Sequence, residues 1–446
     1  MPARRRSTPA FGLLTLLLLS ACSSTLPTTP DTASAPRYDS VASVPLKAGD
    51  TRESVARILG GTVIEWNDSG CAAGVAASCT ALVGLDRGVQ ALSRLKPLGD
   101  RSVQIEPNRD AFSGSGVVGV WAGGVVGVWA GGIVGVWAGG VVGVWAGGVY
   151  ANLPANTSLW QKVNLQQAQA LASNLGAGVT VAVIDTGIDL QHPAFQASLT
   201  DSSTWRDFYG NDNVPQEEGI LGNGAYGHGT SVAGIVLQVA PKARIMPIRA
   251  LGSDGSGDAV MVAQAIQWAA ARGANVINLS LGSAENSTVV QSAINTVTAQ
   301  GILVVASAGN ENQNVLTYPA ANATQKGSGE YALSVGSVDL SDLKSTFSNY
   351  GRSLELVAPS ENVYGPAPEN RMVAWSGTSM AAPMAAGGLA LALGQQRTVA
   401  LKDLTAKMAG TAFDVYNGGA NDAYKGMLGP KGRLDLSKFL DDSIQH

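Results

Sequence analysis

The sequence is poor in charge, in histidine and in cysteine, and each shortage narrows what the protein can do. Charged residues make up 14% of the chain, and 29 basic residues nearly balance 33 acidic ones. An average chain has roughly 25% charged residues. Because no strong positive field results, nucleic acid is not an expected partner. Three cysteines and three histidines are also too few for a metal cluster of the zinc-finger kind.

The hydrophobic residues that a large core needs are present. Their fraction is 45%, which is ordinary for a globular protein and excludes wholesale disorder. A length of 446 residues gives room for two or three domains. Composition and patterning divide the chain into residues 1–21, 22–40, 41–110, 111–150 and 151–446.

Residues 1–21 have the pattern of an export signal. Three arginines at residues 4–6 precede an apolar run, residues 11–19, that is too short to span a bilayer. The next residues, Leu19-Ser20-Ala21-Cys22, resemble a bacterial lipobox, in which Cys22 becomes the lipidated first residue. Residues 22–40 then read as a flexible tether. We therefore expect an exported protein held in the cell envelope through Cys22, at the outer membrane of a diderm bacterium.

Residues 41–110 alternate strand-like and helix-like stretches. Their order, βαββαβ, predicts a small ferredoxin-like α+β module. Cys71 and Cys79 lie eight residues apart in it, and they either close a small loop as a disulfide or remain two unpaired thiols. The expected strands are 44–47, 62–66, 80–85 and 102–105, and the expected helices are 52–59 and 89–95.

Four near-copies of the octapeptide VVGVWAGG fill residues 117–148. An even period keeps each tryptophan on the same face of an extended strand, which favours β-like or linker structure. Glycine at every fourth position also matches the packing ladder of a membrane-associated helix. Three glycines in eight residues argue against a stable helix in water. The pattern suggests no definite function.

Residues 151–446 alternate apolar strand runs with helical stretches, which predicts one large α/β domain with a parallel sheet. Three polar residues stand out at element ends. Asp185 ends a strand run, His228 lies in Gly-His-Gly-Thr-Ser ahead of an apolar run, and Ser379 lies in Gly-Thr-Ser-Met-Ala-Ala-Pro. The proline of that motif is tolerated only near a helix start, so Ser379 is expected beside free N–H groups. The expected strands are 179–184, 244–247, 276–279, 302–306 and 332–335.

The order Asp185, His228, Ser379, together with the flanking residues, resembles the subtilisin-like serine peptidase family over almost all of residues 151–446. The resemblance implies a central parallel sheet flanked by helices, a catalytic triad of these three residues and Asn310 as an oxyanion donor. It also implies that residues 41–110 are an inhibitory propeptide that the enzyme removes itself. The segments implied to pair with the substrate backbone are Gly255, Ser256, Gly257 and Ser280, Leu281, Gly282.

The implied activity is that of an exported serine endopeptidase acting on polypeptides, with its own propeptide as inhibitor. No cofactor is implied for the chemistry. The family often carries a calcium-binding loop after the histidine helix, but residues 234–241 run straight through, so that site is expected to be absent. A calcium site elsewhere, in the acidic segment 201–212, remains a second possibility. Two other functions remain possible from the sequence, a peptide-binding pseudo-enzyme and a structural surface lipoprotein built around the repeats.

Overall fold

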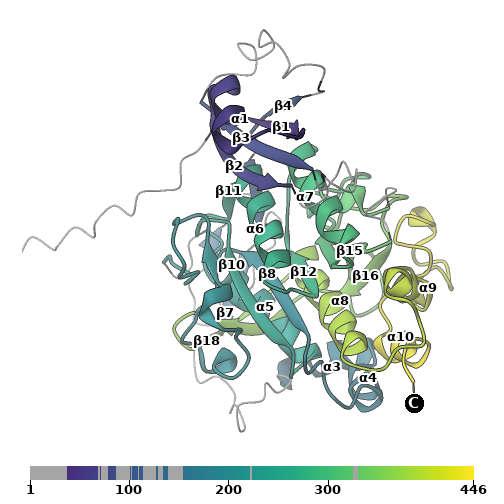
Figure 1. Ribbon diagram of the computed structural model, residues 1–446. Coiled ribbons are helices and arrows are strands. Elements are labelled where there is room, and N and C mark those ends of the chain that lie inside the picture. The colour runs from purple at the N-terminus through teal and green to yellow at the C-terminus, as the bar shows by residue number, and fades with distance from the viewer. Residues whose placement is uncertain are drawn as a thin grey trace, which may run out of the picture. The chain divides into compact units, whose positions relative to one another are not determined.

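The structure is a computed structural model, shown in Figure 1. It describes residues 38–68, 71, 79–86, 101, 103–108, 110–113, 127–128, 134–138, 154–220, 224–324 and 330–445. The export signal, Cys22, the expected helix 89–95 and most of the repeats lie outside the described residues.

A nine-stranded sheet forms the centre of the larger domain, with strand order β19-β20-β16-β15-β14-β12-β8-β10-β9. Its strands pair in parallel except for β19 and β20, which pair antiparallel. The parallel α/β prediction is therefore confirmed. The strands are β8 (Thr180–Asp185), β9 (Arg206–Asp207), β10 (Arg244–Arg249), β12 (Val276–Leu279), β14 (Leu303–Ser307), β15 (Ala332–Val338), β16 (Leu356–Pro359), β19 (Phe413–Asp414) and β20 (Gly432–Arg433).

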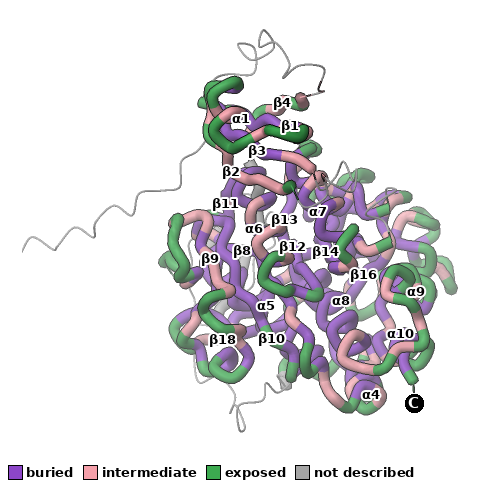
Figure 2. The backbone as a smooth tube through the Cα atoms, in the orientation of Figure 1, coloured by how far each residue is buried: buried purple, intermediate pink, exposed green. Residues whose placement is uncertain are grey.

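Helices cover both faces of this sheet, because alternate residues of each strand point to opposite faces. In β8, Val181 and Val183 belong to one buried cluster, with residues of α5 (His228–Val239) and α8 (Thr378–Leu393). Ala182 and Ile184 belong to the other, with residues of α6 (Ala259–Ala271) and α7 (Thr288–Ala299). Figure 2 shows the strands between these helices as buried. The shorter α-helices are α3 (Thr157–Lys162), α4 (Leu165–Leu171), α9 (Leu404–Gly410) and α10 (Leu436–Asp441).

The described part of residues 41–110 forms a smaller antiparallel sheet of order β2-β3-β1-β4. Thr51 caps its helix by accepting a hydrogen bond from the N–H of Ser54 at 3.1 Å. Cys71 and Cys79 are joined in a disulfide. Its elements are β1 (Ser40–Pro45), α1 (Arg52–Leu59), β2 (Thr62–Asn67), β3 (Thr80–Leu85) and β4 (Gln104–Pro107). The last strand begins two residues later than expected.

Two short stretches of the repeats are strands, β6 (Gly127–Val128) and β7 (Val134–Ala138), and they pair antiparallel. Strand β7 also pairs antiparallel with β18 (Arg371–Trp375), which forms a hairpin with β17 (Val363–Ala367). The repeats therefore cover an edge of the hairpin that leads directly into helix α8.

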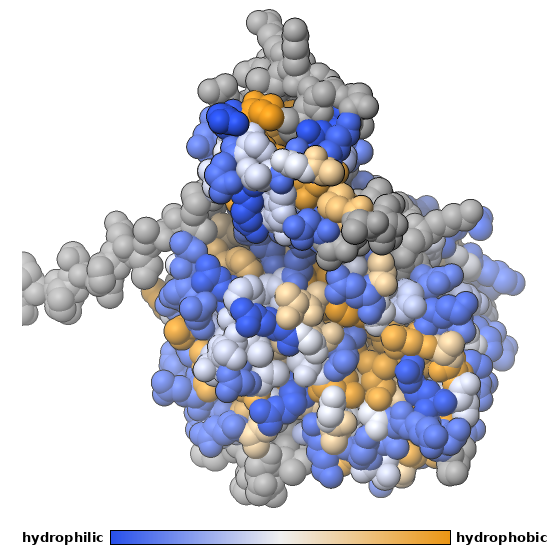
Figure 3. Space-filling view, viewed as in Figure 1, coloured by the Kyte–Doolittle hydropathy of each residue, from blue (hydrophilic) through white to orange (hydrophobic). Residues whose placement is uncertain are grey.

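The outside of the molecule is mostly hydrophilic on the face in Figure 3, with small groups of apolar residues between. The large hydrophobic side chains that are exposed, such as Ile58, Ile220 and Phe413, come from separate segments. Of the helices that the structure describes, none combines the length and the apolar character needed to cross a bilayer.

Candidate active site

Asp185 is the last residue of strand β8, at the carboxyl edge of the parallel sheet where α/β proteins place their sites. Its side chain is fully buried, and its Oδ1 atom accepts a hydrogen bond from the N–H of Thr186 at 2.8 Å. The following Gly187 has φ +101, and a Cβ there would lie 2.9 Å from the carbonyl oxygen of Pro215. The turn therefore requires glycine directly after the Asp-Thr pair.

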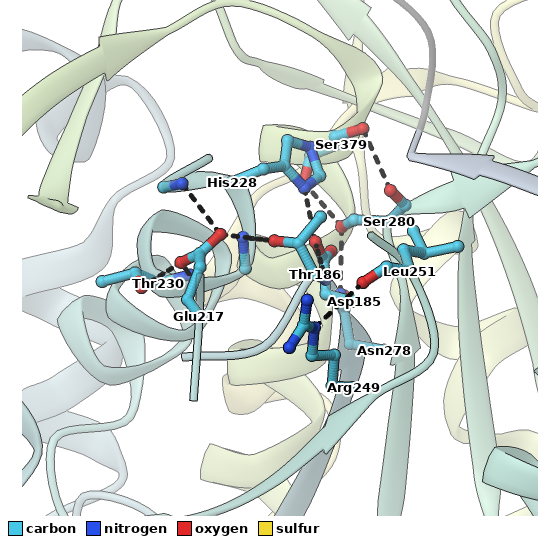
Figure 4. Close-up of polar contacts among 12 residues, drawn as sticks. Asp185, Thr186, Glu217, His228, Thr230, Arg249, Leu251, Asn278, Ser280 and Ser379 are labelled. Atoms are coloured by element: carbon cyan, nitrogen blue, oxygen red, sulfur yellow. Dashed lines mark hydrogen bonds and ion pairs between the residues drawn. The ribbon is translucent and has the colours of Figure 1, made fainter. Parts of the chain in front are cut away.

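His228 is the first residue of helix α5 and faces Asp185. Its Nδ1 atom lies 2.7 Å from Asp185 Oδ1, in a pair that Figure 4 shows at the centre of the site. Gly229 allows this approach, because a Cβ there would lie 2.1 Å from the carbonyl oxygen of Gly187. The Trp375 ring meets the imidazole edge-to-face at 5.6 Å between centroids. The histidine is thus held by a carboxylate on one ring atom and packed by an aromatic ring.

The pKa of His228 is raised above its ordinary value. Burial on its own lowers the pKa, because it disfavours the cation, but the charge of Asp185 and its hydrogen bond raise it, and Glu217 adds to the rise. The site therefore stabilises an imidazolium where a general base would have to form one.

Ser379 is the second residue of helix α8, where main-chain N–H groups have no acceptor within the helix. Its hydroxyl donates to the carbonyl oxygen of Ser280 at 3.3 Å, and Ser280 Oγ donates back to the carbonyl oxygen of Ser379 at 2.7 Å. Within the described residues, His228 Nε2 is buried and has no hydrogen-bond partner. Because Nδ1 is paired with Asp185, this nitrogen is the ring atom that remains to accept a hydroxyl proton.

Asn310 follows strand β14 and faces the start of helix α8. Its Oδ1 atom accepts from the N–H of Thr378 at 2.9 Å and from the Thr378 hydroxyl at 3.0 Å. These two donors fix which end of the amide carries oxygen, so Nδ2 is oriented away from Thr378 as a donor. A serine at a helix start with an oriented amide beside it is an arrangement that suits a developing oxyanion.

The two segments expected to bind a backbone are β11 (Ser256–Asp258) and β13 (Leu281–Gly282), with Gly255 and Ser280 directly before them. A third strand, β5 (Asp110–Ser113), lies between them and pairs antiparallel with both. An apolar hollow lies beside β13, and its lining includes Ala259, Val262 and Val290. The structure thus places the two expected segments on either side of one strand of the same chain.

Two further acidic residues with several hydrogen-bond partners were not anticipated. The carboxylate of Glu106 accepts from the N–H groups of Thr288 and Val289, at 2.8 and 2.9 Å, and from the hydroxyls of Ser287 and Thr288. It therefore caps helix α7 from the smaller domain. The second residue is Glu217, which lies behind the Asp185 turn. Glu106 lies in residues 105–108 at the end of the module, and Glu217 lies outside the motifs of Asp185, His228 and Ser379.

Metal ligands do not gather in the parts of the chain that the structure describes, where no three His, Cys, Asp or Glu side chains cluster. Helix α5 runs unbroken from His228 to Val239, so residues 234–239 belong to the helix. In the segment 201–212, Asp201 caps a short 3₁₀ helix and Asp207 pairs with Arg249 at 3.1 Å. These acids already have partners within the protein.

Comparison with known proteins agrees with this geometry. The model of the subtilase family matches residues 176–429, more than half of the chain. Thermitase from Thermoactinomyces vulgaris is 36% identical over 280 residues, which cover 59% of this chain and 93% of thermitase. Subtilisin Savinase from Lederbergia lenta is 39% identical over 226 residues, 48% of this chain and 76% of that protein. The chain belongs to the subtilase family of serine endopeptidases.

Proposed function

We propose that Ser379, His228 and Asp185 are the nucleophile, the general base and the orienting carboxylate of peptide-bond hydrolysis. The observation that carries this proposal is the 2.7 Å contact between His228 and Asp185 beside Ser379 at a helix start. His228 Nε2 takes the hydroxyl proton as Ser379 Oγ attacks the peptide carbonyl, and it returns that proton to the leaving amine. Asp185 fixes the imidazole tautomer and stabilises its cation. Water then hydrolyses the acyl-enzyme by the same route.

The tetrahedral oxyanion is held by Asn310 Nδ2 and by the main-chain N–H of Ser379. The substrate is an extended polypeptide that adds a strand between Gly255–Gly257 and Ser280–Gly282, so recognition rests largely on main-chain hydrogen bonds. The chemistry requires no metal or cofactor, because every proton and charge in it is handled by these residues.

We propose that residues 41–110 are an inhibitory propeptide. Three contacts support this role. Strand β5, directly after the module, fills the place of a substrate strand, and Glu106 binds the start of helix α7. Val41 and Leu82 of the module also belong to the buried cluster that contains residues of α6 and α7. The full-length chain would then be a zymogen with its cleft occupied from within.

The pairing of β5 suggests where self-processing occurs. In its antiparallel register Phe112 pairs with Gly282, and Ser113 pairs with Leu281, the residue directly after Ser280. Because Ser280 is the hydrogen-bond partner of the Ser379 hydroxyl, we expect the cut at one of the two peptide bonds that follow Ser113. A large apolar residue such as Phe112 or Tyr150 is the choice that sequence alone suggests. Sequencing the N-terminus of the active species decides between these positions.

We also propose that the chain is exported and lipidated on Cys22, and is thereby held at the membrane, in the outer membrane of a diderm bacterium. Two acyl chains already suffice for stable anchoring. Cleavage after Ser113 would cut the covalent route to that anchor, leaving the peptidase attached only while its propeptide stays bound. Labelling with a fatty-acid analogue should mark the wild type and leave Cys22→Ala unmarked. Equal labelling of both would refute lipidation at this residue.

Casein hydrolysis that is blocked by a serine-directed phosphonyl fluoride is the direct test of the activity. The expected result is cleavage by the wild type, inhibition in proportion to modified Ser379, and no cleavage by Ser379→Ala. Peptide binding without cleavage would indicate a pseudo-enzyme, and neither binding nor cleavage would indicate a structural role; either outcome would overturn the proposal.

A further inference from the structure

Glu217 is a fully buried carboxylate directly behind the Asp185–His228 pair, and the steps described above give it no task. We propose that Glu217 is a positioning residue that ties the turn after Asp185 to the first turn of the His228 helix, and that its negative charge supports the imidazolium formed during catalysis. This inference rests on the roles proposed for the triad.

The backbone around Glu217 is fixed to the turn that carries Asp185. The N–H of Glu217 donates to the carbonyl oxygen of Ile188 at 3.0 Å, and the N–H of Ile188 donates to the carbonyl oxygen of Pro215 at 3.0 Å. Ile188 and Gln216 form an isolated parallel bridge. The side chain of Glu217 therefore starts from a backbone that cannot move independently of the Asp185 turn.

The carboxylate joins three separate points of the site. Its Oε1 atom accepts from the N–H of Gly227 at 2.8 Å and from the Thr186 hydroxyl. Its Oε2 atom accepts from the N–H of Thr230 at 3.1 Å and from the Thr230 hydroxyl. Thr186 is the neighbour of Asp185, whereas Gly227 and Thr230 flank His228 in the chain. Figure 4 shows Glu217 between Thr186 and Thr230.

These contacts replace a missing helix cap. The residue before helix α5 is Gly227, which has no side chain that can accept from the first N–H groups of the helix. Glu217 takes the N–H of Thr230, and the Thr186 hydroxyl oxygen accepts from the N–H of Gly229 at 3.0 Å. A glutamate distant in sequence thus caps the helix that begins with the catalytic base, and it does so at the positive end of the helix dipole.

In all four of these hydrogen bonds Glu217 is the acceptor, which is the pattern of an ionised carboxylate. Burial nevertheless raises the pKa of Glu217 to about 7, and the charge of Asp185 contributes to the rise, while the bonds from Thr186 and Thr230 lower it. The other ionisable groups that sense this charge are His228, Tyr226 and Arg249, and the pKa of each is raised in part by it. The charge state of the carboxylate and that of the imidazole therefore depend on each other.

The negative charge of Glu217 should affect catalysis by raising the pKa of His228. Because a negative charge favours the cation, Glu217 contributes to the raised pKa of His228, after the larger contribution of Asp185. Removing the charge while keeping the shape should lower the pKa of His228. The acid limb of kcat/KM, which reports the loss of neutral His228, should then move to lower pH. A residue that only holds the fold would reduce activity without moving this limb.

The decisive variant is Glu217→Gln, which keeps the volume and removes the charge. An amide offers one acceptor oxygen and one NH₂ group, so in either orientation the NH₂ faces a main-chain N–H, that of Gly227 or of Thr230. We expect kcat to fall about 10²-fold, the loss that a displacement of about 1 Å produces. KM should stay within twofold, because Glu217 contacts neither β11 nor β13. Glu217→Asp keeps the charge with a shorter reach, and it should recover part of kcat and the wild-type acid limb.

Glu218→Gln is the matched control, because the neighbouring side chain is largely exposed and contacts Arg249 rather than the triad. It should leave kcat and the acid limb unchanged. The effect of the charge can also be measured without activity. An NMR titration gives the pKa of His228 in folded Ser379→Ala protein, and it is repeated after adding Glu217→Gln. Loss of activity in Ser379→Ala tests the triad itself. An unchanged His228 pKa on adding Glu217→Gln, or unchanged kcat in Glu217→Gln, would overturn the inference while leaving the peptidase assignment intact.

Discussion

Glu106→Ala should release the active enzyme from its propeptide much sooner than in the wild type. Glu106 receives two main-chain N–H groups at the start of helix α7 and two hydroxyls, all between 2.6 and 3.0 Å. Ser287 also accepts from the N–H of Val290 at 3.3 Å, so the helix keeps its own cap when Glu106 is removed. The loss is therefore confined to the contact between the two domains.

Hydrogen bonds to a charged group contribute about 1.5–3 kcal/mol, and we take about 2–3 kcal/mol for this partly exposed carboxylate. Since 1.4 kcal/mol is tenfold, the dissociation constant of the cut propeptide should rise roughly 30- to 140-fold, mainly through faster dissociation. The assay is the lag before peptide hydrolysis begins after self-processing, which should shorten by that factor. Glu53→Ala, an exposed acid on α1, is the control. Equal lags in both variants would refute the reasoning.

Three further predictions concern chemistry and pH. Ser379→Ala should lose about 10⁶ in kcat, the size of loss known for subtilisin, and its chain should remain uncut on a gel. Asn310→Ala should lose about 10²–10³ in kcat with an unchanged thermal unfolding curve. Burial raises the pKa of Glu65 to about 7, so the module loses stability as pH rises from about 4.5 toward 7. Glu65→Gln should therefore increase the free energy of unfolding at pH 8, measured in urea, by on the order of 3 kcal/mol. A pH-independent difference between that variant and wild type would contradict the last prediction.

The sequence allowed the main strands and the positions of the site residues to be predicted, because both depend on local pattern. Long apolar runs mark buried parallel strands, and β12 was predicted to the residue. Asp185, His228 and Ser379 were found because each ends or begins an element and has small neighbours. Strand β17 was missed because Gly365 and Pro366 interrupt its apolar pattern, although its Pro366 is buried beside Gly234 of helix α5.

The supporting residues could not be predicted, because their roles depend on contacts between segments distant in sequence. Glu217 and Glu218 are adjacent and chemically alike, yet one is buried under the triad and the other has a side chain that is 69% exposed. No local pattern separates them. The same holds for Glu106, whose partners lie more than 180 residues further along the chain. Tertiary packing, rather than local propensity, decides which of two similar residues is buried.

The strand that the repeats add to β18 has a consequence for how this gene product can change over generations. The five residues of β7, Val-Gly-Val-Trp-Ala, occur in all four copies of the octapeptide. Because the period is even, moving the chain by one whole copy brings an identical five-residue sequence to β18 in the same alternation. A lineage that gains or loses a copy through replication slippage therefore keeps this edge paired. Copy number can drift while the hairpin leading to Ser379 keeps its neighbour.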